Sequence, residues 1–255
     1  MSVTHSPAVP EINLVDASDL KASLALGWRD FRRAPVLGLA FSAVYVLGGW
    51  LITWAMTAKG QVWWTLPASA GFPILGPFVA CGFYEISRRL EAGEPLVANE
   101  IIGVIFRQKD RQIPAIAAVI VVYFLFWNFL SHMIFALFLG NATMTNVSSS
   151  LAVFLSPQGL SMLAFGTLVG AGFATLLFCL TVVSLPMLLD REVDFVTAML
   201  TSFALVRENP RIMLSWGALI AICLFLGMLP AFLGLLVVLP LFGHASWHLY
   251  RRAIT

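Results

Sequence analysis

The run IPAIAAVIVVYFLFWNFLSHMIFALFL, residues 113–139, contains no charged side chain and decides the fold class. A helix needs about 20 mainly apolar residues to cross the roughly 30 Å hydrocarbon core of a bilayer. The chain of 255 residues is 60% hydrophobic and only 11% charged, whereas soluble domains carry roughly 25% charged residues. So little charge cannot cover a surface that faces water. The sequence therefore predicts an all-α polytopic membrane protein whose main solvent is lipid.

Further apolar stretches of similar length lie on both sides of this run. The predicted crossings cover residues 35–58, 62–86, 113–139, 160–189, 212–229 and 231–250. The last two come from one run, 212–250, which is too long for one crossing and contains Gly227 and Pro230 near its middle. A proline there ends one helix or starts the next, which predicts two helices and a turn. One long kinked helix is the alternative. Residues 1–17 are predicted to be a disordered or extended tail, and residues 18–255 a single membrane domain.

The basic residues predict the orientation. When six crossings thread back and forth, only Lys59 of the 15 Lys and Arg residues falls on the outer side. Cytoplasmic loops carry such an excess of Lys and Arg, so both termini are predicted to lie in the cytoplasm. A single helix over 212–250 would place Arg251 and Arg252 outside, which disfavours that alternative. The net charge of +2 does not suggest nucleic acid, and the basic residues suit anionic lipid headgroups better.

Amphipathic segments occupy three predicted cytoplasmic gaps, at residues 19–33, 97–107 and 194–207. Their apolar residues follow helical spacing, as in helices that lie in the membrane interface with the apolar face toward lipid. In the first segment this stripe consists of Leu20, Leu24, Trp28 and Phe31. The first and third segments align with each other at one offset. The aligned pairs include Asp19 with Asp194, Leu24 with Met199, Trp28 with Phe203 and Pro35 with Pro210. A unit of interfacial helix, proline and membrane hairpin, used three times, is predicted. Chance similarity between amphipathic helices is the alternative.

Two stretches carry a resemblance to a known family. They are PFVACGFYEISRRLEAGE, residues 77–94, and SLPMLLDR, residues 184–191, followed by Asn209-Pro210 and a Ser-Trp-Gly pattern at 215–217. Together they resemble a bacterial family of predicted integral membrane proteins with no assigned function. The resemblance implies a bacterial inner-membrane location and transfers no catalytic residue. Some members are labelled cytochrome c oxidase subunits. A haem–copper centre needs many embedded histidines, however, and this chain has four.

Charged residues near the inner ends of two crossings form a candidate polar cluster. Its members are Glu85, Arg88, Arg89, Asp190 and Arg191. Arg88 and Arg89 follow Glu85 by three and four residues and share its helical face. One reading is a simple ion pair whose side chains reach the cytoplasmic surface. The other is a functional cluster at a cytoplasmic mouth, because both helices end at the same level.

Small residues give a second candidate feature. Gly166, Gly170 and Gly172 form a candidate helix-packing face, because a G-x-x-x-G spacing lets membrane helices approach closely. That face packs either inside the bundle or against a partner protein. The second crossing contains Pro67, Pro73 and Pro77, which predicts a kinked or interrupted helix. Interrupted helices can line a substrate path.

No nucleotide-binding, hydrolase or zinc-protease motif occurs in a suitable context. Two histidines, His244 and His248, share a helical face but are too few for a structural zinc site. We therefore expect no enzyme activity, no catalytic residue, no metal and no cofactor. The sequence favours an accessory or assembly subunit of a membrane complex, such as a respiratory one, with the lipid bilayer and that complex as partners. The alternative is a small-solute or lipid transporter with a path near the second crossing.

Overall fold

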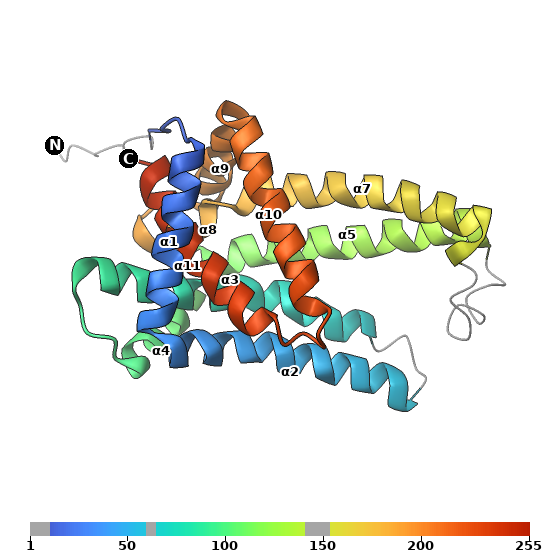
Figure 1. Ribbon diagram of the computed structural model, residues 1–255, viewed down its shortest axis with the longest axis horizontal. Coiled ribbons are helices and arrows are strands. Elements are labelled where there is room, and N and C mark those ends of the chain that lie inside the picture. The colour runs from blue at the N-terminus through green and yellow to red at the C-terminus, as the bar shows by residue number, and fades with distance from the viewer. Residues whose placement is uncertain (1–10, 60–64, 141–153) are drawn as a thin grey trace.

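The computed structural model describes residues 11–59, 65–140 and 154–255, and the side chains among them outside 55–74. Helices account for most of these residues, and the β-type pairing recorded among them joins Ile12 to Ile254. The predicted all-α class is confirmed. In chain order the helices are α1 (Ala17–Arg33), α2 (Pro35–Lys59), α3 (Thr65–Ala92), α4 (Ala98–Arg107), η2 (Gln108–Asp110), α5 (Ile113–Leu139), α7 (Pro157–Thr181), α8 (Ser184–Asp190), α9 (Phe195–Glu208), α10 (Pro210–Met228) and α11 (Leu235–Ala253) (Figure 1).

Several helices are suited to a bilayer. Within the described residues, four spans are long and apolar enough to cross a membrane. They are Pro35–Trp54, Ile113–Leu139, Pro157–Asp190 and Pro210–Met228. The coarse prediction of a multi-helix membrane protein is thereby confirmed. Helices α3 and α11 occupy the other two predicted crossing positions. Two of the predicted outer connections, residues 59–61 and 140–158, lie largely in 60–64 and 141–153, which are outside the described residues. The third is the turn near Pro230.

The long apolar run 212–250 forms two helices, α10 and α11. Pro230 lies in the turn between them, and Ala231 has φ 50°, in the left-handed region that reverses the chain. The Trp50 indole donates to the Ala231 carbonyl at 2.7 Å, which ties this turn to α2. A side chain at Gly234 would lie 2.6 Å from Gly227 Cα, so the tight turn requires glycine there.

The connection between α1 and α2 has the same backbone geometry as that between α9 and α10. Ala34 has φ −129° and ψ 50°, and Asn209 has φ −122° and ψ 49°. Each N–H donates at 3.0 Å to the carbonyl four residues earlier, and a proline begins the next helix. Four of the five buried positions of α1 also coincide with buried positions of α9 at the predicted offset. They are Ser23, Gly27, Asp30 and Phe31 in α1, and Ala198, Ser202, Leu205 and Val206 in α9.

Helices α3 and α11 share a pattern that was not predicted. In each, a proline is followed eleven residues later by two arginines. The residues are Pro77, Arg88 and Arg89 in α3, and Pro240, Arg251 and Arg252 in α11. The second arginine of each pair binds the acid in the first turn of another helix. Arg89 lies 2.7 Å from Glu100 of α4, and Arg252 lies 3.2 Å from Asp19 of α1. An ion pair therefore connects α4 to the end of α3, and an equivalent ion pair connects α1 to the end of α11.

These relations arrange the chain as three units around a common centre. The units are α1–α3, α4–α8 and α9–α11, and the first helix of each packs on the end of another unit. Helix α4 packs on α3, α9 packs on α7 and α8, and α1 closes the ring on α11. The last helices of the units, α3, α8 and α11, contact one another. Figure 1 shows α1 and α11 side by side, and α5 and α7 extending together away from this centre.

The predicted lipid-facing stripe of α1 is only partly available to lipid. The spacing of apolar residues predicted Leu20, Leu24, Trp28 and Phe31 on that face. The structure buries Leu20 and Phe31 within the protein, together with Ser23, Gly27 and Asp30, whereas Trp28 is 44% exposed. The reason is α11, which packs along α1, approaches its backbone closely at Gly27 and donates a hydrogen bond from His248 to Asp30.

Two predicted crossings are also corrected in their helical boundaries. The second crossing was predicted to be kinked or interrupted, and helix α3 continues through Pro67, Pro73 and Pro77, so it is not interrupted. Each proline removes one backbone donor, which neighbouring groups in a bundle can compensate. The fourth predicted crossing, 160–189, is divided into α7 and α8 at Val182 and Val183.

The described part of the predicted tail is extended and pairs with the C-terminus. Glu11 N–H donates to the Thr255 carbonyl at 3.1 Å, and Asn13 N–H donates to the Ala253 carbonyl at 2.9 Å. Helix α11 is buried along much of its length, so this pairing places the two ends of the described chain beside the core.

Candidate functional site: the charged end of the bundle

Glu85 forms the centre of an ion-pair group at the end of α3. Its carboxylate is only 2% exposed and accepts from Arg88 Nε at 2.8 Å and from Arg89 Nε at 2.7 Å. Helical spacing brings these side chains together, because residues three and four apart share a face. Two arginines therefore compensate one buried carboxylate.

Other acids extend this group beyond α3. Arg88 also lies 2.9 Å from Glu94, and Arg89 lies 2.7 Å from Glu100. Arg89 additionally donates to the Pro95 carbonyl at 3.0 Å. Through these contacts the two arginines hold the loop after α3 and the start of α4. This part of the cluster is a structural joint between two of the units.

Asp190 and Arg191 form a second group around Tyr250. The Tyr250 hydroxyl donates to Asp190 at 2.7 Å, and Arg191 Nε donates to the Tyr250 oxygen at 3.0 Å. Arg191 also donates to the carbonyls of Ile254 and Thr255 at 3.3 and 3.2 Å. The group thus connects the end of α8 to the C-terminus of α11.

The two groups meet at a small hollow between α3, α8 and α11. Its volume is about 210 Å³, and both Arg88 and Asp190 line it. The remaining lining residues are Glu91, Ala92, Trp247 and Arg251. The structure therefore places the five residues of the candidate cluster at one end of the bundle, in two groups. The predicted cluster did not contain Glu91, Trp247 or Arg251. The repeated proline–arginine pattern was the signal that could have placed Arg251 in it.

A buried polar network joins α1, α3 and α11 beneath this end. Asp30 is fully buried and accepts from His248 Nε2 at 2.6 Å. Ser87 Oγ lies 2.9 Å from His244 Nδ1, which also lies 3.1 Å from the Phe83 carbonyl. The two histidines therefore bind different groups in the described structure, and they do not point to a shared ligand.

The network determines the charge state of Asp30. Burial acts to raise the pKa of Asp30, but hydrogen bonds from His248, Ser87 and Arg29 and the attraction of His248 outweigh it. The net result is a pKa below the ordinary value. Asp30 is thus held as a carboxylate, and its partners fasten α1 to α11.

The glycine face of α7 lies mostly against α5. A side chain at Gly170 would lie 3.0 Å from Trp127, and one at Gly166 would lie 3.9 Å from Ile134, both in α5. A side chain at Gly172 would meet nothing within 4 Å among the described residues. Two of the three predicted glycines therefore face α5, and the third faces outward.

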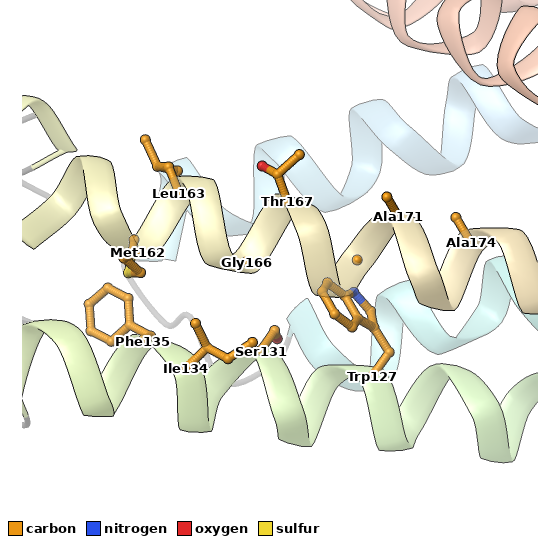
Figure 2. Close-up of a pocket in the computed structure, with 11 residues that line it drawn as sticks. Trp127, Ser131, Ile134, Phe135, Met162, Leu163, Gly166, Thr167, Ala171 and Ala174 are labelled. Atoms are coloured by element: carbon orange, nitrogen blue, oxygen red, sulfur yellow. The ribbon is translucent and has the colours of Figure 1, made fainter.

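An apolar groove of about 550 Å³ runs between α5 and α7. Figure 2 shows Trp127, Ser131, Ile134 and Phe135 on the α5 side. Across from them lie Met162, Leu163, Gly166, Thr167, Ala171 and Ala174 of α7. Such a groove, in helices suited to a bilayer, offers apolar contact and few polar groups.

The middle of the chain is similar to a family of known sequences. Residues 65–190 match the model of a family described as predicted integral membrane protein (DUF2189). The chain matches an uncharacterised family of membrane proteins. The matched part runs from α3 to α8 and contains Glu85, Arg88, Arg89 and Asp190. No curated protein and no solved structure matched the chain.

The family match confirms the predicted resemblance to an uncharacterised membrane family. It gives this chain an integral membrane location and assigns no activity. Among the residues that the structure describes, no three His, Cys, Asp or Glu side chains are grouped so that they could hold a metal ion.

Proposed function

We propose that this protein is a non-catalytic accessory or assembly subunit of a larger membrane complex. In this proposal it crosses a bacterial inner membrane six times, with both termini and the charged end in the cytoplasm. Helices α1, α4 and α9 lie on the cytoplasmic side. The position of nearly all Lys and Arg residues in alternate gaps supports this orientation.

The observation that carries the proposal is the pair of helices α5 and α7. Their outer ends extend together beyond the other described helices, whereas the inner part of α5 packs on α3 (Figure 1). Large apolar side chains are exposed along this pair, among them Phe126, Phe129, Leu137, Leu168 and Leu176. Lipid can cover such a surface, but a second membrane protein can cover it equally well, because helix association in membranes depends on close packing. The groove and the outward Gly172 supply a surface for such packing.

The orientation predicts a clear labelling pattern. The starting chain has its three native cysteines replaced by serine. A single cysteine is then placed at Arg107 or at Lys59, and each variant is tested in intact cells. A membrane-impermeant maleimide should label position 59 and not position 107. Position 107 should become reactive only after the cells are opened. Labelling of position 107 in intact cells would contradict the proposed orientation.

Replacing Gly172 with leucine is expected to release the protein from its complex without unfolding it. The new side chain has free space within the chain but would block a partner at the outward face. After gentle detergent extraction at natural expression, native electrophoresis should show the wild type in a larger complex and Gly172→Leu as a smaller species. The thermal midpoint should match that of the wild type.

Gly170→Leu is the matched comparison on the same helix. Its side chain would collide with Trp127, so it should lower the thermal midpoint. Wild-type protein that is extracted as a lone monomer would contradict the accessory role.

The transporter alternative requires a polar cavity near Pro73 to Pro77. The side chains of residues 55–74 are outside the described set, but α3 is closely packed from Pro77 onward. A side chain at Gly82 would lie 2.6 Å from Phe41 of α2, and Cys81 and Ile86 are fully buried. This packing favours the accessory role.

A further inference from the structure

The hollow at the charged end lies where the three units converge. It is lined from α3, α8 and α11, which are the last helices of the units. Its volume of about 210 Å³ suits a small polar group. A ligand there would contact all three units at once.

Equivalent arginines from two units line this hollow. Arg88 and Arg251 are the first arginines of the pairs in α3 and α11. The second arginines, Arg89 and Arg252, bind Glu100 and Asp19 and hold neighbouring helices. In each pair, the second arginine thus holds a neighbouring helix and the first lines the hollow.

Arg251 has the looser contacts of the two. Its Nε lies 3.3 Å from Glu91, and its Nη1 lies 3.4 Å from Asp190, whereas charge-assisted hydrogen bonds are usually about 2.7–2.9 Å long. The hydrogen bonds described for Arg251 use Nε and Nη1 and leave Nη2 for another acceptor. By contrast, Arg88 is held by two-pronged contacts with Glu85 and Glu94.

The charges around the hollow are balanced. Two guanidinium groups, Arg88 and Arg251, face it together with two carboxylates, Glu91 and Asp190. A simple anion would meet the carboxylates, and a simple cation would meet the arginines. A group that carries both charges side by side can satisfy both. The Trp247 indole closes one wall and donates to Glu91 at 2.9 Å, which keeps that carboxylate in place.

We infer that this hollow binds a phosphate that carries a nearby primary ammonium, the chemistry of a phosphoethanolamine headgroup. The phosphate lies against Arg251, and the ammonium lies against Asp190 and Glu91. Since Asp190, which lines the hollow, ends the apolar span Pro157–Asp190, a phosphatidylethanolamine molecule can reach it from the bilayer. Free phosphoethanolamine has the same charged groups and is the soluble source of this chemistry.

The test measures lipid binding to the full-length protein in maltoside detergent by native mass spectrometry. Dioleoyl phosphatidylethanolamine should bind at least about tenfold more tightly than dioleoyl phosphatidylglycerol, which lacks the ammonium. Arg251→Gln should weaken phosphatidylethanolamine binding by about tenfold, as expected for one charge-assisted contact. Arg252→Gln is the matched control, because Arg252 binds Asp19 and does not line the hollow. It should bind like the wild type.

A second variant keeps the test decisive if Arg251→Gln does not fold. Arg251→Lys retains the charge but loses the forked donor group, and should weaken phosphatidylethanolamine binding relative to Arg252→Gln, by less than about tenfold. Displacement of the bound lipid by free phosphoethanolamine would identify the soluble compound as the ligand. Failure to displace the lipid would identify the bilayer lipid as the ligand. Both results agree with the inferred chemistry. Equal affinity for the two lipids would overturn it. So would Arg251 variants that bind as tightly as Arg252→Gln.

Discussion

Replacing Gly27 with alanine is expected to destabilise the folded chain by about 3 kcal/mol, at the upper end for overpacking. The added methyl group would lie 2.7 Å from the Ala245 nitrogen and 2.8 Å from the Leu241 carbonyl oxygen. Both are backbone atoms of α11, so neither can move aside as a side chain could. The two helices must separate, and Asp30 and His248 then lose their 2.6 Å contact. A clearly lower thermal midpoint in detergent is the expected result.

Gly172→Ala provides the control for this substitution. The same methyl group has open space there, and alanine favours a helix more than glycine does. Its midpoint should equal or exceed that of the wild type. Limited trypsin digestion adds a local measurement, because Arg29, Arg32 and Arg33 lie in the same part of α1. Faster cleavage there is expected only for Gly27→Ala. An unchanged midpoint and cleavage rate would show that α1 is not closely packed on α11.

The second large effect is expected for Glu85→Gln. This change removes the buried negative charge that two arginines share, and Arg89 is itself only 9% exposed at its side chain. Breaking a buried ion pair from one side typically costs about 3–5 kcal/mol, and the partial exposure of Arg88 places this case near the lower value. We therefore expect a loss of about 3 kcal/mol in stability. Thermal unfolding followed by circular dichroism would measure it.

Glu94→Gln is the matched control for the same chemistry. Glu94 also binds Arg88, but its side chain is 42% exposed, so the change should cost about 1 kcal/mol or less. Equal losses for the two variants would contradict the assignment of Glu85 as the centre of the joint. Normal stability of Glu85→Gln combined with lost transport would instead favour the transporter alternative.

Contacts between polar residues of one helix could be predicted from their spacing, whereas contacts between helices could not. Glu85, Arg88 and Arg89 lie within one turn of a helix, so their contacts follow from helical geometry alone. The contacts of Asp190 with Tyr250 and Arg251 connect different helices. Helical spacing within one segment contains no information about such partners, so Glu91, Trp247 and Arg251 were not anticipated.

The stripe on α1 illustrates the same limit. The spacing of Leu20, Leu24, Trp28 and Phe31 predicts an amphipathic helix, and α1 is one. Hydrophobic spacing alone could not show that α11 would cover a neighbouring face that contains Gly27 and Asp30. That choice depends on a close backbone approach and on a hydrogen bond from His248, both supplied by a segment more than 200 residues away.

The amino-acid sequence by itself determined that lipid surrounds much of this protein. It also determined the approximate positions of the helices and the repeat of a helix, a proline and a further helix. These features are local, because they depend on runs of apolar side chains, on proline chemistry and on the spacing of charges. Only the tertiary structure decided that α1 closes the ring on α11, and that Arg88 and Arg251 line one hollow while Arg89 and Arg252 hold neighbouring helices. The physical reason is that burial and ion pairing between distant segments depend on which helix faces come together in three dimensions.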